Sequence, residues 1–429
     1  MRTRSRCRHL CASGTVALVL LAALLLGSPE PVDARQIQGQ ADLGLALRPS
    51  TAGPHDDRIL DAETRLLLER QWYGARGEML DLRVLAVQEL RGDAGVEIRQ
   101  ASLFIPLGGS VEITAGRQVL SWGPGQFEFV NDRFAKDFES FFVGRDLEYL
   151  KAPNDALRTR SFLGSWTVDL VLAPVFQQDR LPDPRSFPVM DPATGQVVAN
   201  PDFKADLPGE DLSSGELHLR VDRQIGRWET ALYGFRGFTG TPGGVREVDG
   251  EATPFHPQMA AVGLSLRGPV LSGLGWLEAA YENIREEGAG VDPQLPPDRW
   301  VTLAGYRWNP TPTRTFMVQG SAIGQVDADR LRETWAEMDP DHPQGERAHL
   351  RLQGNVTESF RADRMQVGVR LLWGVTEEEA HWRLRLGYDI SDDLIFEARY
   401  HGFAGDHPAG RFGLLRDHDL VSLRLRYHL

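Results

Sequence analysis

The chain has 429 residues and a formal net charge of −13 at pH 7. This acidic balance argues against nucleic acid as a partner, because phosphate backbones are bound by clusters of lysine and arginine. Both cysteines, Cys7 and Cys11, lie near the start of the chain. The rest of the sequence therefore excludes a disulfide, a thiolate metal site and a cysteine nucleophile.

Residues 1–34 have the layout of a secretory signal peptide. Four arginines precede an apolar run over 15–26 that is too short to span a bilayer well. Cleavage after Ala34 would remove four arginines and two acids, leaving a single domain over 35–429 with net charge −15. No later apolar run approaches the roughly 18 residues of a transmembrane helix. An exported chain can still cross a membrane as a closed barrel, in which every backbone group is paired.

Stretches of about ten residues alternate between apolar and polar positions from Ala41 onward, as in membrane-spanning strands. In the last stretch, every odd position from Val421 to Leu429 is apolar and every even position is polar or basic. A half-buried strand of a soluble protein looks the same, so the fold depends on repetition along the chain. The expected strands cover 41–47, 64–72, 80–90, 96–106, 111–121, 157–165, 166–176, 216–224, 228–238, 259–267, 274–282, 300–308, 313–322, 348–356, 365–373, 382–390, 394–403 and 421–429.

The connections between these strands alternate between tight turns and long loops. Outer-membrane barrels have short periplasmic turns and long extracellular loops, whereas a soluble sandwich has no reason to sort its loops. The sequence therefore predicts an all-β fold, a transmembrane antiparallel up-and-down β-barrel of about 18 strands, with 16 as the alternative. We expect the last strand to close the barrel beside the first. The expected long loops cover 122–156, 177–215, 239–258, 283–299, 323–345 and 404–417.

The polar positions of the last strands would face a lumen and are rich in arginine. Arginine keeps its charge and binds carboxylates or phosphates through two N–H groups, so such a row attracts anions. The alternative is that these arginines pair with acids across the lumen and only fill space. The candidate anion pathway consists of Arg351, Arg364, Arg370, Arg383, Arg385, Arg399, Arg424 and Arg426.

The loop over 122–156 is too apolar to be a solvated loop. We expect Asn131 to cap a short helix with phenylalanines on one face and charged residues on the other. Folded into the barrel with the charged face toward the pore, this loop would be the constriction. The alternative is a lid over the extracellular rim. The candidate constriction residues are Phe134, Phe138, Phe141 and Phe142 on the apolar face and Arg133, Lys136 and Asp137 on the other.

One motif resembles known families. The run Gly116-Arg117-Gln118-Val119-Leu120-Ser121-Trp122-Gly123 is similar to a strand end in porin-like families of Gram-negative outer membranes. The layout resembles the alginate-export family and other eighteen-stranded substrate-specific channels. The resemblance implies an outer-membrane channel for a small or polymeric anionic solute, with lipid, lipopolysaccharide and the barrel-insertion machinery as partners. The usual terminal aromatic is Leu429 here, while Tyr427 keeps an aromatic third from the end.

Two other functions are alternatives to a channel. An outer-membrane hydrolase needs a nucleophile beside a base, and no serine stands at a telling offset from His218, His349 or His381. We therefore expect no enzyme activity, and no catalytic, metal or cofactor site. A non-conducting assembly or efflux-accessory barrel, plugged by the aromatic loop, is the second alternative. Conductance of the purified protein distinguishes it from a channel.

Overall fold

The computed structural model describes residues 37–50, 57–89, 94–199 and 204–429, so the expected signal peptide, residues 1–34, lies outside them. In this part of the chain, 18 strands form one sheet, and all neighbouring strands are antiparallel. The strands of the sheet are β1 (Gln38–Leu47), β2 (Ile59–Tyr73), β3 (Met79–Glu89), β4 (Ala94–Leu107), β5 (Val111–Val119), β6 (Pro153–Leu163), β7 (Trp166–Ala173), β10 (Glu216–Ile225), β11 (Trp228–Phe238), β14 (Gln258–Val270), β15 (Gly273–Ile284), β16 (Arg299–Thr311), β17 (Arg314–Gln325), β18 (Ala348–Phe360), β19 (Met365–Gly374), β20 (Glu379–Asp389), β21 (Leu394–Ala404) and β22 (Leu420–His428).

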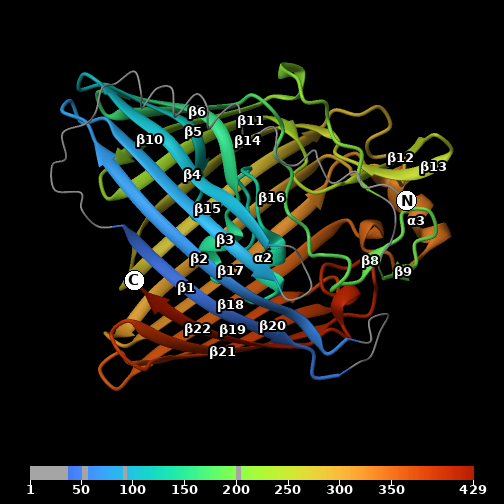
Figure 1. Ribbon diagram of the computed structural model, residues 1–429. Helices are drawn as coiled ribbons and strands as arrows, with labels where there is room; N and C mark the ends of the chain where they lie inside the picture. Colours follow the sequence, from blue (N-terminus) through green and yellow to red (C-terminus); the bar gives the residue numbers. More distant parts are fainter. Residues whose placement is uncertain (1–36, 51–56, 90–93, 200–203) are drawn as a thin grey trace, which may run out of the picture.

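The sheet closes into a barrel because its last strand pairs with its first (Figure 1). In this pairing Leu45 lies opposite Leu423, and Asp42 lies opposite Arg426. Each of the eighteen expected strands corresponds to one strand of the barrel, so the alternative of 16 is wrong. The largest differences lie at the ends of strands. For example, β6 begins at Pro153, four residues before the expected start.

The two ends of the barrel differ as the sequence predicted. Tight turns join the strands at the end where the C-terminus lies, and long loops join them at the other end (Figure 1). Two connections depart from this rule, because only residues 90–93 join β3 to β4 and only residues 375–378 join β19 to β20 at the long-loop end. The long loops contain β8 (Val189–Met190), β9 (Val197–Val198), β12 (Gly244–Val248), β13 (Glu251–Phe255), α2 (Phe138–Phe142), α3 (Asp329–Met338) and the 3-10 helices η1 (Leu147–Leu150), η2 (Leu212–Ser214), η3 (Pro343–Gly345) and η4 (Gly413–Leu415).

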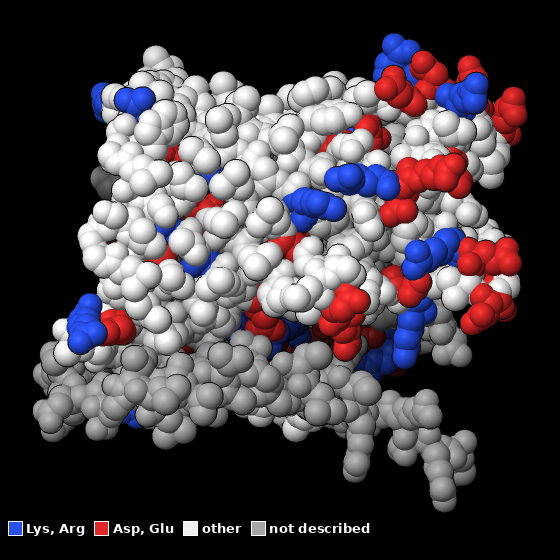
Figure 2. All heavy atoms as spheres, turned by 90° about the horizontal axis from the view of Figure 1, so that it is seen from above, with Lys and Arg blue, Asp and Glu red and all other residues white. Residues whose placement is uncertain are grey.

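The outer wall of the barrel is apolar. On β22, Leu425 and Tyr427 are exposed, whereas Arg424 is buried inside, as the alternation of side chains along a strand requires. Figure 2 shows a wall that is mostly free of charged residues between its ends, with charges concentrated at the long-loop end. A closed barrel with an apolar belt is the architecture of Gram-negative outer-membrane proteins, so the expected location in the outer membrane is confirmed.

No helix in the described part of the chain is long and apolar enough to cross a membrane.

Candidate functional site: a basic cavity beside an inner loop

The loop over residues 120–152, here called the inner loop, lies inside the barrel (Figure 1). Its Gly125 backbone N–H donates to Glu278 of β15 over 2.6 Å. Farther along the loop, the Asp146 carboxylate accepts a hydrogen bond from Arg426 of β22. Arg426 lies six residues beyond the start of its strand, which is about 20 Å along the strand from the extracellular end. The inner loop therefore reaches deep into the lumen, and the alternative of a lid over the rim is wrong.

The helix of the inner loop differs from the prediction. It is the five-residue α2, and its cap is Asp137, whose carboxylate accepts from the Ser140 N–H over 2.7 Å. Asn131 instead donates to Glu278 over 2.7 Å and to the Leu264 carbonyl. The Asn131 side chain, which was expected to cap the helix, thus binds the Glu278 carboxylate of the wall instead.

The phenylalanines of the inner loop contact two different walls rather than sharing one face. Phe138, Phe141 and Phe142 pack in the apolar cluster that contains Phe403. Phe134 packs beside Trp122 instead, with ring centroids 5.0 Å apart. The prediction of a single apolar face is therefore wrong, although Phe134, Phe141 and Phe142 contact the wall residues His218, His381 and Phe403, respectively.

The charged residues of the inner loop are paired, and two of them, Arg133 and Lys136, also line a cavity of about 290 Å³. Lys136 is buried and donates to Asp132 over 3.1 Å. Arg133 donates to the Val130 carbonyl over 2.7 Å and also bonds Glu282 of β15. Burying a charge is costly unless such partners satisfy it. These residues therefore anchor the loop.

Most of the predicted lumen arginines have an acidic partner, as the pairing alternative required. The prediction that Arg364 faces the lumen is wrong, because this residue lies exposed in the tight turn between β18 and β19, outside the lumen wall. The remaining predicted arginines lie on strands with buried or half-buried side chains. The paired ones are Arg351 with Glu377 and Glu128, Arg385 with Glu397, Arg399 with Glu397 and Asp146, Arg424 with Glu63 and Asp42, and Arg426 with Asp42 and Asp146.

Arg370 and Arg383 differ from the other lumen arginines. They lie directly opposite each other on β19 and β20, where like charges repel. Both side chains are buried, and neither forms an ion pair with a residue that the structure describes. The Nε and Nη1 groups of Arg370 also have no hydrogen-bond acceptor in this part of the chain. These two guanidinium groups therefore carry positive charge that no ion pair with a described acid neutralises.

A cavity of about 250 Å³, here called the basic cavity, exposes these charges. It lies between the inner loop and the wall formed by β18 to β21, and Asp146 is the acid in its lining. Since Asp146 bonds both Arg399 and Arg426, it neutralises little of the cavity. The arginines that line the basic cavity are Arg145, Arg370, Arg383, Arg385 and Arg399.

A second cavity of about 220 Å³ is lined mainly by acids, two of which, Asp61 and Glu139, form ion pairs with Arg145. Asp61, Glu89, Asp183 and Glu139 of α2 line it. Burial is the main cause that raises the pKa of Glu139 to about 7, and the neighbouring acids add to it against the opposing charge of Arg145. Glu139 therefore changes its charge close to neutral pH.

The motif that carried the family resemblance forms the start of the inner loop. Gly116 has a φ of +117°, and a Cβ there would lie 2.3 Å from the Ala101 carbonyl oxygen, so only glycine fits. Gly123 has a φ of +75°, and a Cβ there would lie 2.7 Å from a carboxylate oxygen of Glu278. Trp122 is buried against Phe134.

Arg117 and Gln118 of the motif lie on opposite faces of β5. Gln118 is buried inside and donates to the Ala156 carbonyl over 3.1 Å. Arg117, on the opposite face, forms an ion pair with Asp155 of β6 at 3.4 Å. The motif therefore fixes where β5 ends and the inner loop turns inward.

Sequence reasoning missed the residues that anchor the inner loop most firmly. Arg145 is buried and bonds Glu63 of β2 over 2.7 Å. Glu128 forms ion pairs with Arg351 and with Arg411 of the loop between β21 and β22. No local pattern marks these residues, because their partners are far away in sequence.

Comparison with known proteins gives the fold. No family model and no curated protein matches the sequence. Three solved structures from Pseudomonas aeruginosa share the barrel, and each alignment covers 92% of this chain. OccK5 (OpdH) is 10% identical, with 97% of its own chain covered and a TM-score of 0.56. OccK2 (OpdF) in complex with glucuronate is 12% identical, with 97% covered and a TM-score of 0.54, and OpdK with vanillate is 10% identical, with 98% covered and a TM-score of 0.53. The expected similarity to eighteen-stranded substrate-specific channels is thus confirmed at the level of the fold.

Proposed function

We propose that this barrel is an outer-membrane channel for small anionic solutes, with the inner loop as its constriction. The pair of Arg370 and Arg383 carries the proposal, because two buried arginines face each other without an acid beside them and line a cavity. An anion that enters the basic cavity gains from both charges. Glucuronate and vanillate, named with OccK2 and OpdK, are both carboxylates, which supports a small organic anion over a polymer.

The reversal potential of the purified protein in a planar bilayer tests this function. In a steep KCl gradient, the reversal potential should have the sign of a pore that is more permeable to chloride than to potassium, despite the negative net charge of the chain. A potential of the opposite sign would contradict the proposal. No conductance at all would favour the plugged barrel. The contacts that the inner loop makes with several strands across the lumen support this alternative.

The anion preference should fall as pH rises through neutrality. Glu139 has a raised pKa of about 7, so its carboxyl is mostly neutral at about pH 6 and mostly negative at about pH 8. The acidic cavity then gains a charge that repels anions. Reversal potentials at the two pH values should show this shift. The E139Q variant should show a smaller shift between the two pH values than the unmodified protein.

Glu337 provides the matched control for this titration, because it lies exposed on α3. The E337Q variant should keep the pH dependence of the unmodified protein. An equal loss of pH dependence in E337Q and E139Q would assign the effect to general surface charge and would contradict the role of Glu139.

A further inference from the structure

Phe127 of the inner loop has an unusual backbone and an unusual neighbour. Its φ of +63° lies in the left-handed region, which is costly for a residue with a Cβ. Its ring covers Arg370, with the guanidinium carbon 4.1 Å from the ring centroid. A cation over a ring face is attracted to it. The ring thus occupies one face of an arginine that has no acidic partner among the described residues.

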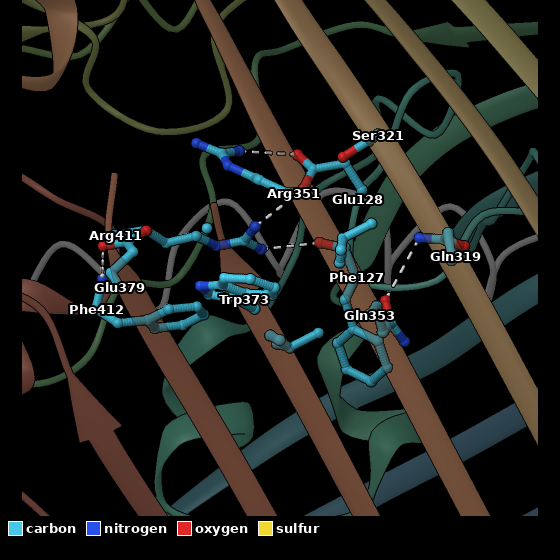
Figure 3. A pocket seen from close by; sticks show the side chains of 13 residues that line it. Phe127, Glu128, Gln319, Ser321, Arg351, Gln353, Trp373, Glu379, Arg411 and Phe412 are labelled. Atoms are coloured by element: carbon cyan, nitrogen blue, oxygen red, sulfur yellow. Dashed lines mark hydrogen bonds and ion pairs between the residues drawn. The ribbon is translucent and has the colours of Figure 1, made fainter. Parts of the chain in front are cut away.

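Arg411, from the loop over 405–419 between β21 and β22, holds this conformation. One Nη donates to the Phe127 carbonyl over 2.8 Å, and the other forms an ion pair with Glu128 at 3.0 Å. Arg351 of β18 binds the other oxygen of Glu128 at 3.2 Å (Figure 3). Burial alone would raise the pKa of Glu128, but Arg411 and Arg351 lower it below its usual range. Glu128 therefore stays charged and keeps both partners.

Phe127 stands between two cavities. Together with Arg411 and Arg299 it lines a cavity of about 290 Å³ toward the long-loop end, here called the vestibule. Arg370, beneath the ring, lines the basic cavity, which extends toward the tight-turn end past Thr357 and Gly368. A solute arriving from outside meets the ring before it meets Arg370. A solute arriving from the periplasm reaches Arg370 and Arg383 first.

We propose that Phe127 is a one-sided gate over Arg370 and that Arg411 is the residue that positions it. The ring limits access of anions from the extracellular side and leaves access from the periplasmic side unaffected. This inference rests on the proposed anion channel and adds a residue that determines the direction of easiest entry.

The rate at which sulfate blocks chloride current measures access from each side. Orientation of single channels is assigned by one-sided proteolysis of an extracellular loop. The F127L variant keeps apolar bulk and removes the ring. Its block rate for sulfate added on the extracellular side should rise about fivefold, which corresponds to about 1 kcal/mol of lost cation–π attraction. The rate for sulfate added on the periplasmic side should not change.

Substitutions in the loop over 405–419 test the positioning role of Arg411. The R411Q variant removes the positive charge beside Glu128 and should raise the extracellular block rate as F127L does. The R411K variant keeps a charge beside Glu128 and should restore part of the difference between the sides. Arg416, exposed on the same loop, is the control, and R416Q should behave as the unmodified protein does.

Two other outcomes separate the gate from the channel. If sulfate blocks the unmodified protein but F127L raises the rates from both sides equally, or changes neither, the gate is wrong and the anion channel stands. If the unmodified protein passes no chloride, both proposals fail. If it passes chloride but sulfate blocks it from neither side, the gate fails and the anion channel is judged by its reversal potential. A heat-dependent gel shift confirms that each variant has folded, and F127L alone decides the question if R411Q does not fold.

Discussion

Replacing Arg370 and Arg383 together by glutamine is expected to remove most of the anion preference of the channel. One charge at about 4 Å contributes about 4 kcal/mol at an effective dielectric of 20, before desolvation and salt reduce it. If only a tenth of this survives from each residue, the pair contributes about 0.8 kcal/mol, or roughly fourfold in selectivity. The reversal potential in a KCl gradient should therefore move toward the equilibrium potential of potassium.

The matched control is the double variant R370K/R383K. Lysine keeps the two charges but loses the planar fork of arginine, so this variant should keep the sign of the reversal potential. Equal loss of selectivity in both double variants would show that the charge of these residues is not the cause. The paired residues Arg385, Arg424 and Arg426 are poorer targets, because their acids would be left unpaired.

Replacing Arg145 by methionine should release the inner loop from the wall. The guanidinium group is buried and bonds Glu63 over 2.7 Å and Ser140 over 3.3 Å. Removing one partner of a buried ion pair costs about 3–5 kcal/mol, because the other charge is left behind. At about 3 kcal/mol the equilibrium for the docked loop shifts more than about a hundredfold. Single-channel conductance should therefore increase, with larger current noise.

Glu63 supplies the control for this release. In the double variant E63Q/R145M the buried charge is removed together with its partner, so part of the loop docking should return. Because Glu63 also binds Arg65 and Arg424, the recovery should be incomplete. Unchanged conductance in R145M would mean that the other contacts of the loop suffice to hold it.

The barrel could be predicted because lipid and lumen impose a strict alternation on each strand. The strand expected over 228–238 corresponds to β11 residue for residue, and the closing contact of β22 with β1 was also predicted. The loops carry no such pattern. The short hairpins β8–β9 and β12–β13 were missed, and the helix expected to begin at Asn131 is displaced because that side chain binds Glu278.

The candidate site could be predicted only in part, because charge pairing in a lumen depends on partners across the barrel. The sequence identifies Arg424 as inward-facing, but its partner Glu63 lies 361 residues away. It also places Arg370 and Arg383 on the same wall without showing that these two lack an acid. Phe127 lies in a loop that the sequence identifies only as unusually apolar, and its left-handed backbone has no sign in the sequence.

The order of folding follows from the two neighbouring residues Arg145 and Asp146. Arg145 binds β2, 82 residues earlier in the chain, while Asp146 binds β21 and β22, 253 and 280 residues later. Contacts between such distant segments form late, because the chain entropy of bringing them together must be lost first. The inner loop can dock only after the first and last strands have met. Closure of the barrel and docking of the inner loop are therefore one late event during assembly. A partly formed sheet has neither a closed wall nor a narrowed lumen.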